Sequence, residues 1–205
     1  MDKFKSMTEL KELTKEGKDW EIEFENRSSM VTILAIHGGG IDPATTELAY
    51  TIAHRGNYNY FSFKGMRSKG NNELHVTSTH YDDQIALDLV RGSQRTVAIH
   101  GCEGNESVAY IGGSDDRLIE LITESLEDIG ISVREAPHHI SGTQENNIVN
   151  MTQTQGGVQL ELTAQLRKEL FKNRKSSRKN RENKDNWGDL MYDFADAMKK
   201  AIERA

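Results

Sequence analysis

The chain has 205 residues and a formal net charge of −6, and its 36% hydrophobic and 28% charged content is typical of a soluble globular protein. This length allows one domain with a substantial core, so we expect a single domain over residues 1–205. No apolar run approaches the roughly 20 residues of a membrane span, and the first residues lack the apolar centre of a secretory signal, which predicts synthesis in the cytoplasm and no membrane partner. A single cysteine, Cys102, excludes an internal disulfide framework.

Apolar spacing and helix-capping signals predict the elements of the first half. In chain order they are a helix over residues 8–16, strands over 20–25 and 31–36, a helix over 45–54, strands over 58–63 and 74–79, a helix over 82–89 and a buried strand over 96–99. Thr45 is expected to cap the second of these helices, and Gly56 is its stop signal.

The second half is predicted to begin with a strand over 107–111, followed by an amphipathic helix with Ser114 as its N-cap and Gly130 as its stop. Strands over 131–134 and 158–162 and a helix over 187–204 complete the order. Strands alternate with helices throughout, which predicts the α/β class: one domain with an open, mixed, mostly parallel sheet and helices on both faces.

Two buried strands end on a histidine that is followed by glycine. LAIHGGG places His37 at such an end, and VAIHGCEG places His100 there. Ligands of open α/β sheets bind beyond the carboxyl ends of strands, and neutral imidazole is a common zinc ligand. A single histidine of this kind is more often structural, but two in the same local pattern indicate a shared zinc site.

Catalytic zinc sites commonly add a carboxylate to two histidines and leave one position for water. Asp42 follows the three glycines after His37, and such a turn can fold its side chain back to the metal. Asp42 can also be an ordinary turn residue before Pro43. Glu47 is more typical of an early-helix acid that complements the helix dipole, yet it stays open as the third ligand.

A general base is expected in the segment GGVQLELTAQLR. Strand alternation puts Glu161 on the face opposite the apolar side chains. Burial would raise its pKa toward the range useful for deprotonating a water, whereas on a half-exposed strand it would be a surface acid. His80 is expected at another strand end, lining the same crevice, and His75 is expected to be a structural strand residue.

A basic segment interrupts this pattern. Nine of the 26 Lys and Arg residues lie between Leu166 and Lys184, with only two acids among them. We expect the part over about 172–185 to be a flexible, solvated loop. The alternative is a contact with a polyanion.

Taken in order, several motifs resemble the poly-γ-glutamate hydrolase family, which Bacillus phages and phage-like regions of Bacillus chromosomes encode. They are HGGGI-D-P-x-T-x-E, LH-x-TSTH-x-D, IHG near position 100, IGG-x-D, N-I-x-N and GVQLEL-x-x-x-LR. The resemblance covers nearly the whole chain. It implies a zinc peptidase with a core similar to zinc carboxypeptidases, acting on the γ-glutamyl amide bonds of anionic poly-γ-glutamate.

By the same resemblance, His37 and His100 match the histidine ligands and Glu161 matches the glutamate base. The family usually reads HGGGIE, so Asp42 is one methylene shorter than the family's acid, which leaves the third ligand open. Arg167 matches the LR of the last motif, and a guanidinium suits a bidentate contact with a substrate carboxylate.

Two glycines complete the predicted site. Gly38 and Gly39 are expected to permit close approach of substrate and to offer backbone N–H groups to a developing oxyanion. Substrate attraction by local positive charge predicts an activity that falls with salt.

Two other classes of function remain open. A zinc amidohydrolase or deacylase for small N-acyl amino acids would use the same centre. A non-enzymatic polyanion- or nucleic-acid-binding protein would use the basic segment, but that segment lacks interleaved aromatics and the acidic remainder would repel a nucleic acid. We therefore expect no nucleic-acid partner. We also expect a monomer, and the phage resemblance implies that it reaches the extracellular polymer after host lysis.

Overall fold

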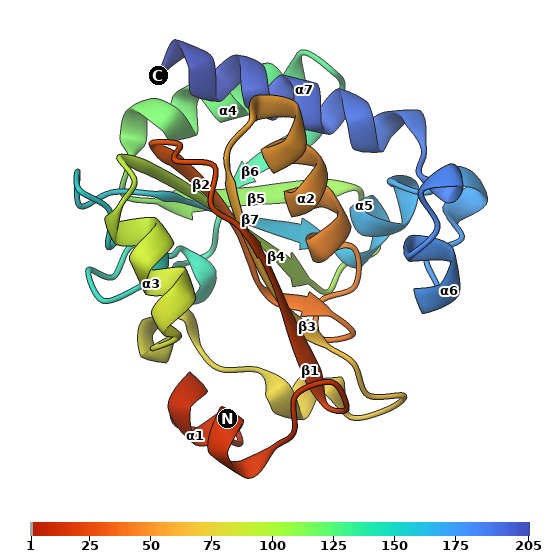
Figure 1. Ribbon diagram of the computed structural model, residues 1–205. Coiled ribbons are helices and arrows are strands. Elements are labelled where there is room, and N and C mark those ends of the chain that lie inside the picture. Colours follow the sequence, from red (N-terminus) through yellow and green to blue (C-terminus); the bar gives the residue numbers. More distant parts are fainter. Residues whose placement is uncertain (1) are drawn as a thin grey trace.

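The computed structural model describes residues 2–205, which fold around one seven-stranded sheet (Figure 1). The strands lie in the order β1-β3-β2-β4-β7-β5-β6, with the bounds β1 Trp20–Glu25, β2 Val31–Gly39, β3 Asn59–Gly65, β4 Arg95–Cys102, β5 Val108–Gly113, β6 Ser132–Glu135 and β7 Val158–Thr163. β1 is antiparallel to β3 and β5 to β7, whereas the other neighbours are parallel. The predicted mixed, mostly parallel sheet is confirmed.

Helices cover both faces of this sheet, as predicted. The α-helices are α1 Met7–Leu13, α2 Thr45–Gly56, α3 Gln84–Arg91, α4 Asp116–Glu127, α5 Ala164–Glu169, α6 Arg178–Arg181 and α7 Asp189–Arg204. One hydrophobic cluster joins α2, α4 and α7 to the sheet, and a second joins α1 and α3 to the opposite face. Within residues 2–205, no helix is both long and apolar enough to cross a membrane.

The central strands are buried on both sides. In β4, Val97 and Ile99 belong to the cluster under α2 and α7, whereas Ala98 belongs to the cluster under α1 and α3. Strands covered on both faces need no polar side, which explains why they read as continuous apolar runs.

The strand predicted over 74–79 is wrong. The segment instead forms two 3₁₀ helices, η1 Asn71–Leu74 and η2 Ser78–His80, outside the sheet. Leu74 and Val76 are buried in the cluster under α1 and α3, and the residues around them are more exposed. The alternation of buried and more exposed residues is typical of a strand, but this segment is not part of the sheet.

Two predicted helix caps are also wrong by one residue. Ala44 stands at the N-cap of α2 and Thr45 is the first helical residue. At α4 the N-cap is Asp115, whose carboxylate accepts the Leu118 N–H at 3.0 Å. The Ser114 hydroxyl donates to Asn150 Oδ1 instead, at 2.8 Å.

The basic segment folds into short helical turns: η5 Lys172–Arg174, α6 and η6 Lys184–Asn186. Most of its cations are exposed, but the Arg181 side chain is buried, with 7% of its surface accessible. The predicted flexibility of the segment stays a prediction.

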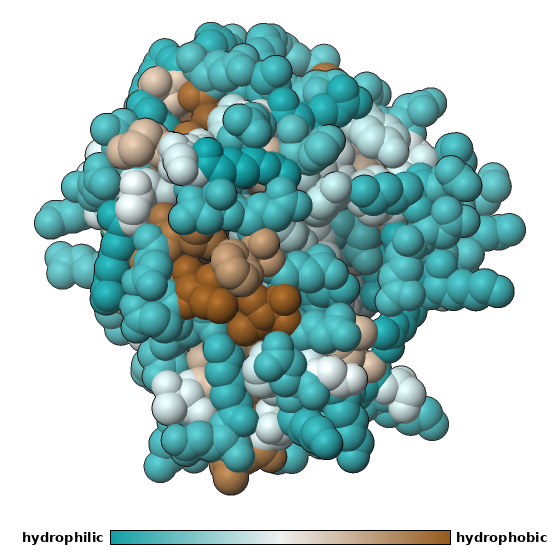
Figure 2. Space-filling view, in the orientation of Figure 1, coloured by the Kyte–Doolittle hydropathy of each residue, from teal (hydrophilic) through white to brown (hydrophobic). Residues whose placement is uncertain are grey.

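The surface is mainly hydrophilic on the face that Figure 2 shows. Hydrophobic side chains gather near its middle, between α3 and the upper part of β1. Phe24 of β1, at 50% exposure, is one of the few large apolar side chains that the structure leaves open to solvent.

Candidate active site

A β-bulge in β2 directs the first predicted ligand. Ala35 pairs with Ser62 of β3 and Gly38 pairs with Lys64, so β2 carries one extra residue between these two points. In a regular strand, His37 would face the same side as Ala35, under α2. The extra residue re-aims it, and His37 Nε2 lies 2.8 Å from the carbonyl of Val76 on the opposite face.

His37 and His100 meet on that face. Their Nδ1 atoms are 3.1 Å apart, and both rings are buried. Because the Val76 carbonyl can only accept, His37 Nε2 carries the proton and His37 Nδ1 presents a lone pair. Two nitrogens that each lie ~2.0–2.1 Å from one tetrahedral zinc are about 3.3 Å apart, close to the separation observed here.

Asp42 completes the cluster. Its Oδ2 lies 3.7 Å from His37 Nδ1 and accepts the backbone N–H of Gly101 at 3.1 Å. Potential ligand atoms of His37, Asp42 and His100 all lie within 4.8 Å of one another. Glu47, the other acid considered as third ligand, pairs instead with Arg181 at 3.3 Å.

Burial sets the charge of these groups. It lowers the pKa of His37 well below its usual value and that of His100 to about 3, so both rings are neutral and able to donate lone pairs. Burial also raises the pKa of Asp42 to about 6. Within residues 2–205, His100 Nε2 is buried without a hydrogen-bond partner. Two neutral imidazoles and one carboxylate form a donor set that suits a divalent cation such as zinc.

Glu161 faces the same space from the neighbouring strand. It is the register partner of His100 in the parallel β4–β7 pair, so both side chains project from the same face. Gln159 Nε2 donates to Glu161 Oε1 at 2.9 Å. Burial, followed by the repulsion of Asp42, raises the pKa of Glu161 to about 8. The Glu161 side chain is buried, as the sequence interpretation required.

A cavity of about 420 Å³ is lined by Glu161 and by His37, Asp42 and His100, but His80 is not among its lining residues. His80 is exposed on η2, whereas His75 and His139 line the cavity. The His75 ring lies against His37, with 3.9 Å between centroids, and its Nδ1 donates to Asp2 Oδ1 at 2.8 Å. The expectation for His80 failed because the strand that was to carry it does not form.

Sequence reasoning missed His75 and His139. The LH-x-TSTH motif contains His75 and was the only signal for it. The contact with Asp2 joins residues more than 70 positions apart, and local spacing carries no information about such a pair.

Arg167 holds three backbone segments together. Its Nε donates to Leu162 O at 3.1 Å, Nη1 to Pro43 O at 2.9 Å and Nη2 to Cys102 O at 3.0 Å. Since Pro43 follows Asp42, these bonds fix the turn that carries the acid. Its expected contact with a substrate carboxylate stays a prediction.

The glycine turn is tightly packed against the protein itself. A Cβ at Gly38 would lie 2.2 Å from Thr46 Oγ1, and a Cβ at Gly39 would lie 2.7 Å from the Gly65 carbonyl. Gly39 also has a φ of +64°, which favours glycine. Its N–H donates to Thr46 Oγ1 at 2.9 Å, so that N–H is already engaged within the protein.

Comparison with known proteins agrees with this geometry. A family model described as poly-gamma-glutamate hydrolase matches residues 4–197. The SPbeta prophage-derived UPF0714 protein YoqZ of Bacillus subtilis (strain 168) is 36% identical over 172 residues, which cover 83% of this chain. The match spans 62% of the length of YoqZ.

Two solved structures have nearly the same fold. A bacteriophage poly-gamma-glutamate hydrolase is 30% identical with a TM-score of 0.95, covering 100% of this chain and 98% of that one. A zinc-free structure of YndL is 29% identical with a TM-score of 0.92, covering 99% and 98%. The predicted likeness to zinc carboxypeptidases stays a prediction. By the match of the family model over residues 4–197, the chain belongs to the poly-gamma-glutamate hydrolase family.

Proposed function

We propose that this protein is a zinc-dependent hydrolase that cleaves γ-glutamyl amide bonds of poly-γ-glutamate. The observation that carries the proposal is the convergence of His37, Asp42 and His100 beside the buried carboxyl of Glu161. The family and the matched phage enzyme support the substrate. The description of the YndL structure as zinc-free supports the choice of metal.

His37 Nδ1, Asp42 Oδ2 and a nitrogen of His100 would hold the ion. A zinc ion there would act as a Lewis acid on the scissile carbonyl and on the attacking water. The buried rings stay neutral, and the Val76 carbonyl fixes the orientation and tautomer of His37.

Glu161 serves as the general base and then as the general acid. Its carboxylate takes a proton from the attacking water and returns it to the leaving amine. The pKa of about 8 in the metal-free site suits the protonated carboxyl as a proton donor to the leaving amine, and the positive charge of a bound zinc ion would favour the carboxylate that takes the proton from water. Gln159 keeps one carboxyl oxygen in place by its hydrogen bond.

Arg167 acts as a positioning residue in this scheme. By tying Pro43 to Leu162 and Cys102, it keeps Asp42 at the distance that the metal requires.

The proposal also covers where the protein acts. The similarity to phage and prophage proteins supports release by host lysis, after which the protein would meet the extracellular polymer as a monomer. Size-exclusion chromatography with light scattering tests the monomer, and assay of lysates against the medium tests the release.

Metal analysis and polymer cleavage test the proposal together. The purified protein should contain about one zinc per chain and shorten poly-γ-glutamate, with activity lost on chelation and restored by zinc. Glu161→Gln should keep the zinc and lose about 10²–10⁴-fold in kcat. His37→Ala and His100→Ala should lose zinc and activity, whereas His54→Ala, an exposed histidine of α2, should change neither.

Small N-acyl amino acids serve as the competing substrates. Turnover of these without shortening of the polymer would replace the proposed substrate by the small-molecule alternative. Full activity in thoroughly chelated protein, or in Glu161→Gln, would contradict the mechanism.

A further inference from the structure

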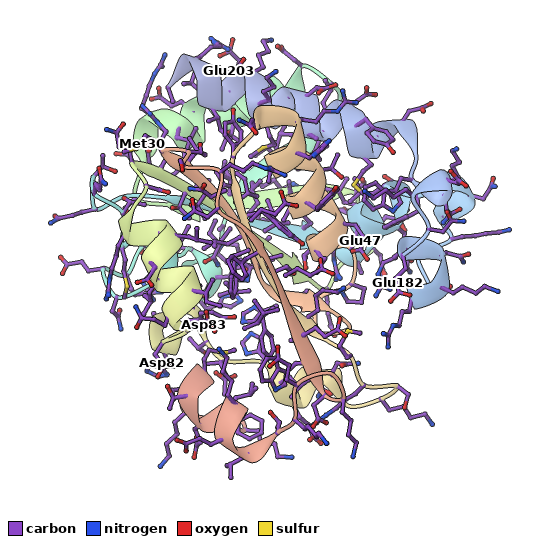
Figure 3. All side chains as sticks on the ribbon, viewed as in Figure 1. Met30, Glu47, Asp82, Asp83, Glu182 and Glu203 are labelled. Carbon is purple, nitrogen blue, oxygen red and sulfur yellow. The ribbon has the colours of Figure 1, made fainter. Side chains whose placement is uncertain are left out.

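A second, larger cavity lies away from the metal centre. It measures about 630 Å³ and lies between β1, the first turns of α2 and the basic segment. It shares no lining residue with the cavity of the metal centre, and the turn at Gly39 and Gly40 contributes to its wall. Figure 3 shows two of its acids, Glu47 and Glu182, on the side of the molecule where α2 faces α6.

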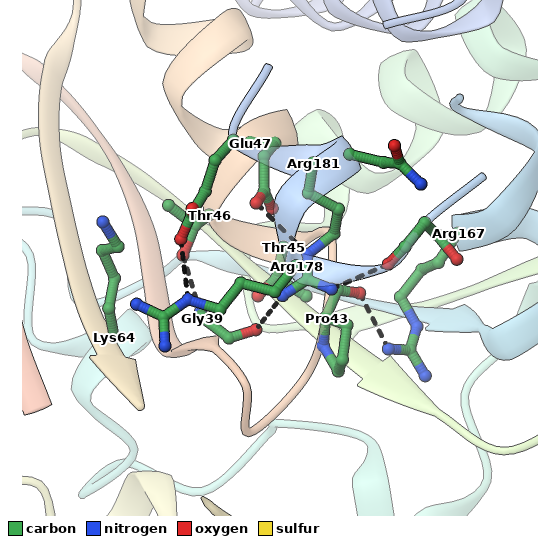
Figure 4. Close-up of polar contacts among 12 residues, drawn as sticks. Gly39, Pro43, Thr45, Thr46, Glu47, Lys64, Arg167, Arg178 and Arg181 are labelled. Atoms are coloured by element: carbon green, nitrogen blue, oxygen red, sulfur yellow. Dashed lines mark hydrogen bonds and ion pairs between the residues drawn. The ribbon is translucent and has the colours of Figure 1, made fainter. Parts of the chain in front are cut away.

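Only one of the two carboxylate oxygens of Glu47 has a hydrogen-bond donor among the described residues. Glu47 is 8% exposed, and its Oε1 accepts from Arg181 Nε at 3.3 Å. Figure 4 shows the Arg181 guanidinium between the Glu47 carboxylate and the Gly39 carbonyl, to which it also donates at 3.1 Å. Among the described residues, Glu47 Oε2 is buried without any hydrogen-bond partner. A buried acceptor without a donor is costly, so a ligand that supplies an N–H there would be stabilised.

One cation in this cavity has no carboxylate. Three of the four lining cations form ion pairs with acids of the chain: Lys64 with Glu23, Arg178 with Glu182 and Arg181 with Glu47. Lys184 forms none within residues 2–205. Its Nζ lies 3.1 Å from the Tyr50 hydroxyl and 4.3 Å from the centre of that ring.

Aromatic rings connect these two groups. Tyr50 lies one helical turn after Glu47 on α2, so both side chains are on the same side of the helix. Its ring makes edge contacts with Tyr60 and Trp187, at 5.7 Å and 6.3 Å between centroids. The cavity thus offers an unsatisfied anion, an unpaired cation and an apolar surface beside them.

We propose that this cavity binds a zwitterionic α-amino acid, whose ammonium meets Glu47 Oε2 and whose carboxylate meets Lys184 Nζ, with the carbon chain against the aromatic side chains that line the cavity. Four acids and four bases line the cavity, so a ligand with one charge of each sign leaves it balanced. The choice of glutamate as the probe rests on the proposed function. Free glutamate and the amino-terminal residue of a γ-linked chain present the same ammonium and α-carboxylate.

Calorimetric titration of the zinc-loaded protein tests the site. Glutamate should bind saturably, and glutarate and N-acetylglutamate, which lack the ammonium, should bind at least about tenfold more weakly. Trp187 lines the cavity, so glutamate should also change the tryptophan fluorescence.

Variants assign this binding to the cavity rather than to the metal centre. Lys184→Gln and Glu47→Gln should each weaken glutamate binding by about tenfold or more. Lys200→Gln makes the same change of charge at the exposed end of α7, where Lys200 pairs with Asp128, and should bind as the wild type does. Glutamate that fails to bind, or that binds Lys184→Gln and Glu47→Gln as it binds the wild type, would overturn the proposal.

A γ-linked glutamate oligomer, with a free or an acetylated amino end, separates the two sources of the ligand. On the Glu161→Gln variant, a Lys184-dependent preference for the free amino end would identify the chain terminus as an occupant. Binding of free glutamate alone would identify the free amino acid. These are binding measurements, so they stand even if the protein fails to cleave poly-γ-glutamate.

Discussion

Two residues of the active site, His37 and Asp42, owe their directions to contacts that are distant in sequence. The bulge in β2 turns His37 away from α2, and the Val76 carbonyl then fixes its ring. Gly101 holds Asp42 by one backbone N–H, and Gln159 holds Glu161. His37 and Asp42 are therefore oriented by partners from other elements, whereas Glu161 is oriented by Gln159, its neighbour in β7.

The charge of Glu161 should be visible in the stability of the metal-free protein. Its pKa is about 8 in the folded state, against an ordinary 4.5, so folding favours the protonated form. This stabilisation is fully present below about pH 4.5 and is lost as the pH rises through 8. Glu161→Gln should remove this loss in the free energy of unfolding, which is about 4 kcal/mol at about pH 8. Thermal unfolding of chelated protein at several pH values measures it.

The matched control for this pH series is Glu127→Gln, an exposed acid of α4. It should keep the pH dependence of the wild type. A wild-type protein whose unfolding temperature does not fall relative to Glu161→Gln between about pH 5 and about pH 8 would show that Glu161 is ionised without cost.

Among the elements, the basic segment is held to the body by one buried ion pair. Arg181 joins the Glu47 carboxylate of α2, the Gly39 carbonyl of β2 and the Ser176 carbonyl of its own segment. The sequence predicted this basic segment to be a solvated loop, but one of its arginines is buried against the body of the protein. Only Arg181, of the residues between 172 and 184, has a buried side chain.

Removal of this arginine should destabilise the protein strongly. Arg181→Met leaves the Glu47 carboxylate buried without its cation, at a cost of about 3–5 kcal/mol. Adding Glu47→Gln to Arg181→Met should recover part of the loss, because an amide needs no counterion. Urea unfolding measures both.

Arg178→Met is the control for this pair, because Arg178 is 48% exposed in its pair with Glu182. An exposed ion pair is worth about 0–1 kcal/mol, so the control should be mild. Equal losses from Arg178→Met and Arg181→Met would show that burial of the Glu47 pair does not matter.

The N-terminus of α4 is capped by the side chain of Asp115. Asp115→Ala removes the acceptor of the Leu118 N–H and should cost about 1 kcal/mol in the free energy of unfolding. Asp115→Asn keeps an oxygen at that position and should be nearly neutral. A loss of the same size in both variants would mean that charge, rather than capping, stabilises this helix.

The whole molecule brings the active site together at one edge of a sheet. Parallel β2, β4 and β7 deliver His37, His100 and Glu161 to their carboxyl ends, where ligands of open α/β sheets bind. Most of the molecule is acidic, and nine of its 26 basic residues lie between 166 and 184. The proposed polyanionic substrate would therefore meet local attraction on a molecule that repels it overall.

The rate on long poly-γ-glutamate should fall as salt rises. Ions screen the attraction of the basic segment for the polymer, so kcat/KM should decrease between about 0.05 and about 0.5 M salt. A short γ-linked dipeptide, which carries few charges, should lose much less. An increase with salt on the polymer would show that repulsion by the acidic body dominates.

Strands and their end residues are the part of the site that sequence reasoning predicted well. His37, His100 and Glu161 lie in segments whose apolar runs identify buried strands, and Asp42 follows one of them by a short turn. The strand predicted over residues 74–79 does not form. Leu74 and Val76 are buried and the residues around them are more exposed, but this alternation arises outside the sheet. His80 was misplaced for the same reason, and His75 was overlooked.

The sequence by itself determined the fold class and the positions of His37, His100 and Glu161 near strand ends, because apolar periodicity and strand-end residues are local properties of the chain. Only the tertiary structure decided which way His37 points, that Glu47 pairs with Arg181 rather than joining the metal cluster, and that His75 lies beside His37. These outcomes depend on strand register and on side chains tens of residues apart, which pack together only when the sheet and its covering helices are complete.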